Sequence, residues 1–132
     1  MKSTVAVISI GSNSDDRSQK VELAIEFLRE ILRDTHVSTV YESEAFNHND
    51  KAPYTNAVVV GKTVITMETL NLSLKEFETQ SGRDSTARAN GIVPIDLDIV
   101  IWDGRIIRND DFERPYFNVG YRELLSKGAF EE

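Results

Sequence analysis

The sequence of 132 residues contains no cysteine, which excludes disulfide bonds, thiolate metal sites and a cysteine nucleophile. Proline and glycine are also few, with 3 and 7 residues, so we expect short or moderate loops. No apolar stretch approaches the roughly 20 residues of a membrane-spanning helix. The N-terminus lacks the apolar stretch and cleavage site of a signal peptide. We therefore expect one cytoplasmic domain over residues 1–132 that does not engage a membrane.

Positive charge is scarce as well. Lysine and arginine total 15 against 22 aspartates and glutamates, which gives a formal net charge of −7. This balance argues against a nucleic-acid partner, because such binding depends largely on neutralising phosphates, and against docking on anionic lipid. A few local arginines can still bind a small molecule that carries phosphate. The sequence does not indicate an oligomeric state.

Hydrophobic periodicity predicts four strands and two long helices. Strand-like runs occupy residues 4–10, 36–43, 55–65 and 95–102. Apolar residues recur at helical spacing over 16–34 and 67–81, and a short helix is expected over 120–127. Residues 44–53, which include His48, and residues 82–94 are predicted to be polar loops. The order βαββαβ predicts an α+β, ferredoxin-like two-layer sandwich with two helices on one face of an antiparallel sheet. Its other face is a natural place for a ligand unless the tail covers it.

Two aspartates interrupt the apolar run 95–102, although aspartate disfavours strands. Side chains of a strand alternate between faces. The helix-facing side is therefore expected to carry Ile95, Leu97, Ile99 and Ile101. The opposite side is expected to carry Asp96, Asp98, Val100 and Trp102. At about 3.3 Å per residue, the two aspartates lie roughly 6.5–7 Å apart, so they can hold two hard cations bridged by phosphate oxygens. A solvated edge strand explains the pattern about equally well.

The polar loop just before this strand carries Arg83 and Arg88 among small residues and glycines. Arginine binds phosphates through paired hydrogen bonds. Beside a pair of metal-binding carboxylates, such a loop suits phosphoryl or pyrophosphoryl transfer, which needs charge neutralisation and positioning. Taken alone, an ordinary solvated loop remains the more common explanation.

A third set of residues suits a flat ring. Tyr54 and Asn56 share one face of the strand 55–65 and its entry, so a ring can stack on the tyrosine while the amide contacts its edge. Tyr116 and Phe117 offer a second aromatic wall near the end of the chain. Core packing is the alternative for these aromatic residues.

Six segments in order along the chain resemble one family, the 6-hydroxymethyl-7,8-dihydropterin pyrophosphokinases of folate biosynthesis. They are Gly11-Ser12-Asn13, Tyr41-Glu42-Ser43, Tyr54-Thr55-Asn56-Ala57-Val58, Glu78 with Gly82-Arg83, Ile95-Asp96-Leu97-Asp98-Ile99, and Arg114 with Tyr116. Each segment is weak alone, but the ordered set covers nearly the whole chain. The chain is therefore identified as a divergent member.

The resemblance implies transfer of pyrophosphate from ATP to the pterin hydroxymethyl group, with release of AMP, by an ATP-dependent diphosphotransferase. It implies that Asp96 and Asp98 hold two Mg²⁺ ions and act in catalysis together with Arg83. The residues implied to bind the pterin are Ser43, Tyr54, Asn56 and Tyr116. The residues implied to lie near the nucleotide are Glu78, Arg83 and Arg114. We expect Arg88 of the same loop to bind the nucleotide as well, in compensation for the family residues that the loop lacks.

The chain also departs from the family pattern, mainly on the ATP side. Val93 stands where the family usually has an arginine, and Ser85 and Asn90 replace an arginine and a tryptophan of the loop. No histidine follows His48, whereas the family has one near its end. Two alternatives therefore stay open: a pterin- or nucleotide-binding module without transferase activity, and an interaction or regulatory domain whose aspartates are merely solvated.

Overall fold

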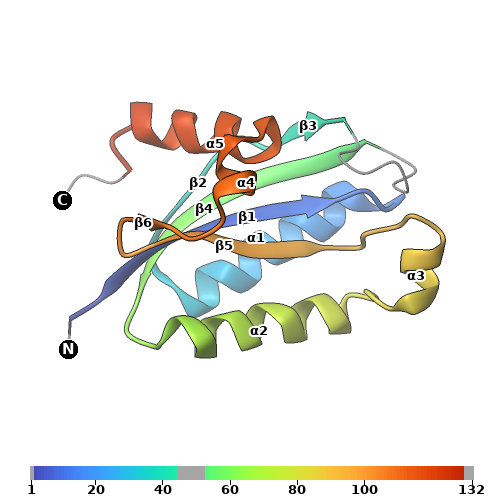
Figure 1. Cartoon of the computed structure of the whole chain (residues 1–132), viewed down its shortest axis with the longest axis horizontal. Helices are drawn as coiled ribbons and strands as arrows, with labels where there is room; N and C mark the ends of the chain where they lie inside the picture. Colours follow the sequence, from blue (N-terminus) through green and yellow to red (C-terminus); the bar gives the residue numbers. More distant parts are fainter. Residues whose placement is uncertain (1, 45–52, 130–132) are drawn as a thin grey trace.

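The structure is a computed structural model that describes residues 2–44 and 53–129. One antiparallel sheet forms its centre (Figure 1). The strands are β1 (Thr4–Ser12), β2 (Arg33–Val37), β3 (Tyr41–Ser43), β4 (Tyr54–Thr63), β5 (Asp96–Trp102) and β6 (Arg105–Ile106). The sheet order is β2-β4-β1-β5-β6. Both β2 and β3 pair with β4, and β3 pairs with its first residues. The prediction of a ferredoxin-like α+β sandwich is confirmed.

Two long helices, α1 (Arg17–Ile31) and α2 (Met67–Gln80), cover one face of the sheet (Figure 1). Each turns an apolar stripe to the strands, so Val21 and Leu28 of α1 and Leu70 and Leu74 of α2 are fully buried. Burying side chains of this size stabilises a fold by about 1.5–3 kcal/mol each. This packing fixes α2 beside β5, the strand that carries the two aspartates.

The other face is partly covered by α5 (Pro115–Ser126), which is longer than the helix predicted over 120–127 (Figure 1). The helix begins at Pro115, because proline suits the first helical position, where its missing N–H is not needed. Phe117 and Leu124 are buried against Val58 and its neighbours in a second apolar cluster. The preceding short helix α4 (Asn109–Glu113) and strand β6 were not predicted.

The single strand predicted over 36–43 is wrong, because the chain forms two strands there. Between β2 and β3, the backbone N–H of Thr39 donates to the carboxylate of Glu123 on α5, at 2.9 and 3.0 Å. The hydroxyl of Ser38 accepts a hydrogen bond from the N–H of Val58, at 2.9 Å. These side chains take the place of sheet partners, so the strand is interrupted where α5 docks.

The predicted alternation along β5 holds through Ile99 and then fails. Val7 on β1 pairs with Ile101, but its neighbour Ile8 pairs with Ile99, so Val100 is an extra residue that forms a β-bulge. Beyond the bulge, Ile101 joins the cluster beneath α5, and Trp102 packs on the side of α1 and α2. The faces predicted for these two residues are therefore wrong, because a bulge exchanges the faces of the residues that follow it.

Two other boundaries differ from the prediction. The predicted loop 82–94 contains the short helix α3 (Ser85–Ala89), which begins after Asp84, whose carboxylate caps the N–H of Ala87 at 2.8 Å. The first helix ends at Ile31, not at residue 34. His48 and most of the predicted loop 44–53 lie outside the described residues. In the part of the chain that is described, no helix has the length and apolar character needed to cross a membrane.

Candidate functional site

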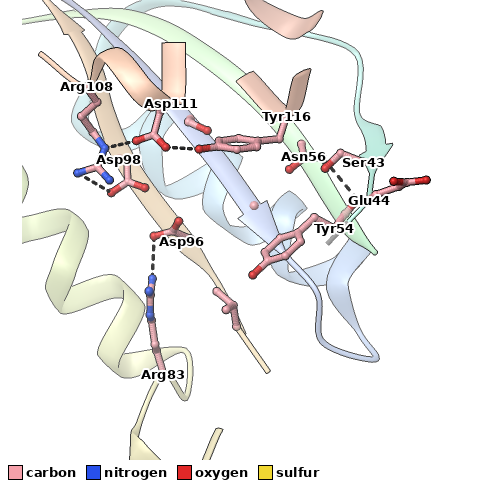
Figure 2. A pocket seen from close by; sticks show the side chains of 13 residues that line it. Ser43, Glu44, Tyr54, Asn56, Arg83, Asp96, Asp98, Arg108, Asp111 and Tyr116 are labelled. Atoms are coloured by element: carbon pink, nitrogen blue, oxygen red, sulfur yellow. Dashed lines mark hydrogen bonds and ion pairs between the residues drawn. The ribbon is translucent and has the colours of Figure 1, made fainter. Parts of the chain in front are cut away.

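A pocket of about 290 Å³ opens on the sheet face opposite α1 and α2, above β4, β1 and β5. Many of the residues predicted from the sequence line it: Ser43, Tyr54, Asn56, Arg83, Asp96, Asp98 and Tyr116. Figure 2 shows the two tyrosine rings on one side of this pocket and the two aspartates on the other. The structure thus gathers residues from five separate segments of the chain into one hollow.

The floor of the pocket is β1, and the register of the sheet places its walls. Gly11 pairs with Asn56 on one side and with Asp96 on the other, and Ser9 pairs with Asp98. A Cβ atom at Gly11 would lie 3.3 Å from Oδ1 of Asn56 and 3.4 Å from Cδ2 of Tyr54. Glycine at this position therefore keeps the floor open between the two walls.

Tyr54, Asn56, Ser43 and Tyr116 line one half of the pocket, which we call the ring-binding half after the prediction that a flat ring stacks there. Asn56 is only 2% exposed, and its Nδ2 donates to Oγ of Ser43 at 2.8 Å. This bond joins β4 to β3 and fixes the orientation of the amide. The sequence predicted that Tyr54 and Asn56 share a face, and both indeed line the same pocket.

In the charged half, Asp96 forms a close ion pair with Arg83. The distance from Nη1 of Arg83 to Oδ1 of Asp96 is 2.7 Å, and the same nitrogen lies 3.2 Å from Oε1 of Glu78. Burial alone would raise the pKa of Asp96, but the hydrogen bond and the charge of Arg83 lower it below its usual value. Asp96 is therefore an anion that Arg83 partly neutralises.

Asp98 lies deeper, with its side chain 14% exposed. Burial, and then the negative charge of Asp96, raise the pKa of Asp98 to about 7. Two cations oppose this effect, since Nζ of Lys75 lies 3.2 Å from Oδ1 of Asp98 and Nη1 of Arg108 lies 3.8 Å from it. Burial would lower the pKa of Lys75, yet the charges of Asp98 and Glu78 raise it above its usual value. The pair of aspartates is thus a concentrated negative charge ringed by cations.

Sequence reasoning missed Lys75, Arg108 and Asp111, all of which contribute to this half. Lys75 and Glu78 are three residues apart and form an ion pair at 3.0 Å, so their helical spacing was a usable signal. Arg108 and Asp111 carried no such signal, because they reach the pocket only through the unpredicted segment around α4.

Glu78, Arg88 and Arg114 do not line this pocket. Glu78 is buried and accepts a hydrogen bond at 2.7 Å from the N–H of Leu97, the residue between the two aspartates. It therefore ties α2 to β5. Arg88 is exposed on α3, and Arg114 lines a neighbouring hollow of about 540 Å³, which shares Ser43 and Tyr116 with the first.

The segment that precedes β5 is anchored by Asn13. The buried side chain of Asn13 donates to the carbonyl of Gly91 at 2.9 Å and accepts from the N–H of Val93 at 2.5 Å. Val93 itself lines the pocket at the position where the resemblance led us to expect an arginine. Asn13 thus holds the arginine-bearing segment against the end of β1.

Asp96 and Asp98 have the chemistry that suits a hard divalent cation. Among residues 2–44 and 53–129, no group of three or more histidines and carboxylates is placed to hold a metal ion. Mg²⁺ does not need such a group, because it is commonly bound by one or two carboxylates together with substrate phosphates and water. The donor set therefore fits a cation that arrives with a phosphate-bearing ligand.

Comparison with known proteins agrees with this site. A family model described as "7,8-dihydro-6-hydroxymethylpterin-pyrophosphokinase (HPPK)" matches residues 7–126, so the chain belongs to this family. A protein of Aquifex aeolicus named 2-amino-4-hydroxy-6-hydroxymethyldihydropteridine pyrophosphokinase is 33% identical over 109 residues, which are 83% of this chain and 68% of that one. A protein of the same name from Haemophilus influenzae is 29% identical over 129 residues, 96% of this chain and 79% of its own. The folic acid synthesis protein fol1 of Schizosaccharomyces pombe is 28% identical over 126 residues, 94% of this chain but 17% of its own length.

Proposed function

We propose that this protein is an ATP-dependent diphosphotransferase of folate synthesis. It transfers the pyrophosphoryl group of ATP to the hydroxymethyl oxygen of 6-hydroxymethyl-7,8-dihydropterin and releases AMP. The observation that carries this proposal is the joining, in one pocket, of a carboxylate pair and an arginine with two tyrosine rings and a fixed amide. The first set suits a nucleotide triphosphate, and the second suits a flat heterocycle that carries hydrogen-bonding groups.

The pterin occupies the ring-binding half. Its ring lies between Tyr54 and Tyr116, and stacking of a base on an aromatic side chain contributes about 1–3 kcal/mol. Asn56 contacts the edge of the ring, since its amide offers both donor and acceptor atoms. The amide is held by Ser43, so the ring meets a prearranged partner. The hydroxymethyl group is then directed toward β5.

The phosphates occupy the charged half, where Asp96 and Asp98 would hold two Mg²⁺ ions that neutralise phosphate charge. Arg83 is placed beside Asp96 to bind the transferring group, as arginine commonly does in phosphoryl transfer. The pterin oxygen forms a bond to the β-phosphorus of ATP. The bond from that phosphorus to the oxygen shared with the α-phosphate breaks, AMP leaves with that oxygen, and the hydroxyl proton passes to water.

Arg108 supplies a positive charge in place of the arginine that the family pattern has at the position of Val93. Val93 brings no charge to the pocket, but Arg108 enters from the segment before α4 and lies 3.8 Å from Asp98. It supplies a cation on the phosphate side that the sequence pattern did not reveal. Glu78 and Arg114 act from the periphery of the site, and Arg88, exposed on α3, contacts the nucleotide from outside the pocket. A single domain and a cytoplasmic location stay predictions.

The proposal is tested by incubating the purified protein with ATP, Mg²⁺ and hydroxymethyldihydropterin and measuring AMP. We expect AMP in equal amount to the pyrophosphorylated pterin. The apolar Val93 in the pocket favours one competitor, a pterin-binding module without transferase activity. Stabilisation against heat by pterin, with no AMP and no stabilisation by an ATP analogue with Mg²⁺, would establish that competitor.

A further inference from the structure

One carboxylate of α4, Asp111, contacts both halves of the pocket. Its Oδ1 accepts a hydrogen bond from the hydroxyl of Tyr116, and its Oδ2 accepts one from Nε of Arg108. The side chain is only 14% exposed and lines the pocket. In Figure 2 these three side chains form one connected row from the ring side to the aspartates. No pattern in the sequence indicated that Tyr116 or Arg108 contacts Asp111.

Tyr116 is held at its other end by a second contact. The hydroxyl of Tyr41 on β3 donates to the backbone carbonyl of Tyr116 at 2.5 Å and accepts from the N–H of Gly120 at 3.2 Å. The backbone of Tyr116 is thus fixed from the sheet, and its phenol is fixed from α4. Asp111 thus holds the phenol end of a ring whose backbone is held from the sheet.

The Arg108 end of the row leads to the charged half. Nη1 of Arg108 lies 3.8 Å from Oδ1 of Asp98, while its Nε is engaged by Asp111. A bond from Nε leaves Nη1, on the other edge of the planar and rigid guanidinium, directed away from that partner. Asp111 therefore sets the side of Arg108 that faces the phosphate region.

We propose that Asp111 is a positioning residue that aligns the Tyr116 ring for the pterin and the Arg108 guanidinium for the phosphates at the same time. This inference rests on the proposed function for the identity of the two ligands. Burial, and then the bond to Asp111, raise the pKa of the Tyr116 phenol. The phenol therefore stays a hydrogen-bond donor throughout the physiological pH range.

The test separates the two contacts with three variants. Asp111→Ala removes both, Tyr116→Phe removes only the phenol contact, and Asp111→Asn keeps an acceptor for the phenol but presents an amide without charge to Arg108. Asp110→Asn and Asp110→Ala are the matched controls, because Asp110 is the exposed neighbour on the same helix and does not line the pocket. Pterin Kd is measured by calorimetry and kcat by AMP release.

We expect Tyr116→Phe and Asp111→Ala each to raise the pterin Kd by about fivefold to tenfold, the effect of one lost hydrogen bond. Combining the two should raise it no further, because both remove the same contact. Asp111→Asn should instead leave the pterin Kd within about threefold and lower kcat by about tenfold or more, the effect of losing a bond to a charged group. The Asp110 controls should match the natural protein.

The inference is overturned if folded Asp111 variants match the Asp110 controls, or if the effects of Asp111→Ala and Tyr116→Phe on Kd add. Should Asp111→Ala not fold, as a thermal melt would show, the opposite responses of Kd and kcat in Asp111→Asn and Tyr116→Phe decide the matter. If the unsubstituted protein binds pterin but releases no AMP, the proposed function is contradicted. The pterin Kd values of the variants then still test the role of Asp111. A natural protein that binds no pterin contradicts both.

Discussion

The two halves of the pocket are built by different means. In the ring-binding half, Tyr54, Asn56 and Ser43 lie on paired strands, and the sheet register alone brings them together. In the charged half, only Asp96 and Asp98 come from a strand. Their cationic partners arrive from α2, from the segment after it and from the segment before α4.

This difference shows which half of the pocket depends on contacts with other segments for its shape. Strand partners are held by the backbone ladder, so Tyr54, Asn56 and Ser43 of the ring-binding half are preformed without a ligand. The charged half is held by ion pairs that compete with any incoming phosphate or cation, because each carboxylate already has a cationic partner. We therefore expect changes in the charged half to affect chemistry, and changes in the ring-binding half to affect binding.

The largest effect is expected from Asp96→Asn or Asp98→Asn, each of which removes an anion from the charged half without changing its shape. AMP formation should fall by about a thousandfold, the scale on which key electrostatic contacts act in group transfer. Asp103→Asn is the control, because Asp103 is an exposed residue just after β5 and asparagine tolerates its positive φ of 52°. Activity within threefold of normal in both site variants would contradict the division into halves.

Arg83→Ala should come next, with a loss of about a hundredfold in kcat, as expected for one cation at a transferring phosphate. The pterin Kd should stay close to normal, since Arg83 contacts Asp96 and not the ring-binding half. Arg88→Ala is the matched variant, because Arg88 lies on the neighbouring helix α3 and outside the pocket. A larger loss from Arg88 than from Arg83 would reverse this assignment.

In the ring-binding half, Tyr54→Leu should raise the pterin Kd by about fivefold to 150-fold, which corresponds to the roughly 1–3 kcal/mol of a stacked ring. The Kd of an ATP analogue with Mg²⁺ should not change. Tyr54→Phe keeps the ring and should bind pterin almost normally. Calorimetry with each ligand checks both statements, and an equal loss for pterin and nucleotide would show that the halves are not separable.

The last effect concerns stability and its pH dependence in the metal-free protein, not activity or binding. Since the pKa of Asp98 is raised to about 7, the folded state holds a proton that the unfolded state releases near pH 4. The contribution of Asp98 is therefore fully present below about pH 4 and is lost as pH rises to about 7. The free energy of unfolding, measured with urea in the presence of a chelator, should decline less between about pH 4 and pH 7 in Asp98→Asn than in the natural protein. An identical decline in both proteins would refute the assignment to Asp98.

The sequence predicted much of the site because part of the site is local. Asp96 and Asp98 share a face because β5 is regular up to Ile99, and Tyr54 and Asn56 share one for the same reason. These relations follow from alternation within a single strand, which needs no knowledge of the partners. The α+β fold was also predictable, since the apolar stripes of α1 and α2 are continuous.

The remainder depended on distant contacts that no local pattern encodes. Arg108 and Asp111 reach the pocket through the segment around α4, and Lys75 reaches Asp98 through the docking of α2. Arg88 lies exposed on the short helix α3, which was not predicted. Its expected place near the nucleotide stays a prediction.

The extra residue at Val100 has a consequence for how the protein can change over time. It allows one side of β5 to be wet where the aspartates lie and dry where Ile101 meets the α5 cluster, while Trp102 supports the opposite layer. Substitutions at Ile101 and Trp102 can therefore change the stability of the fold without changing the direction of Asp96 and Asp98. Deleting Val100 would exchange the faces of Ile101 and Trp102 and remove both from their clusters. The strand therefore tolerates substitutions at either end separately, but it does not tolerate a change in its length.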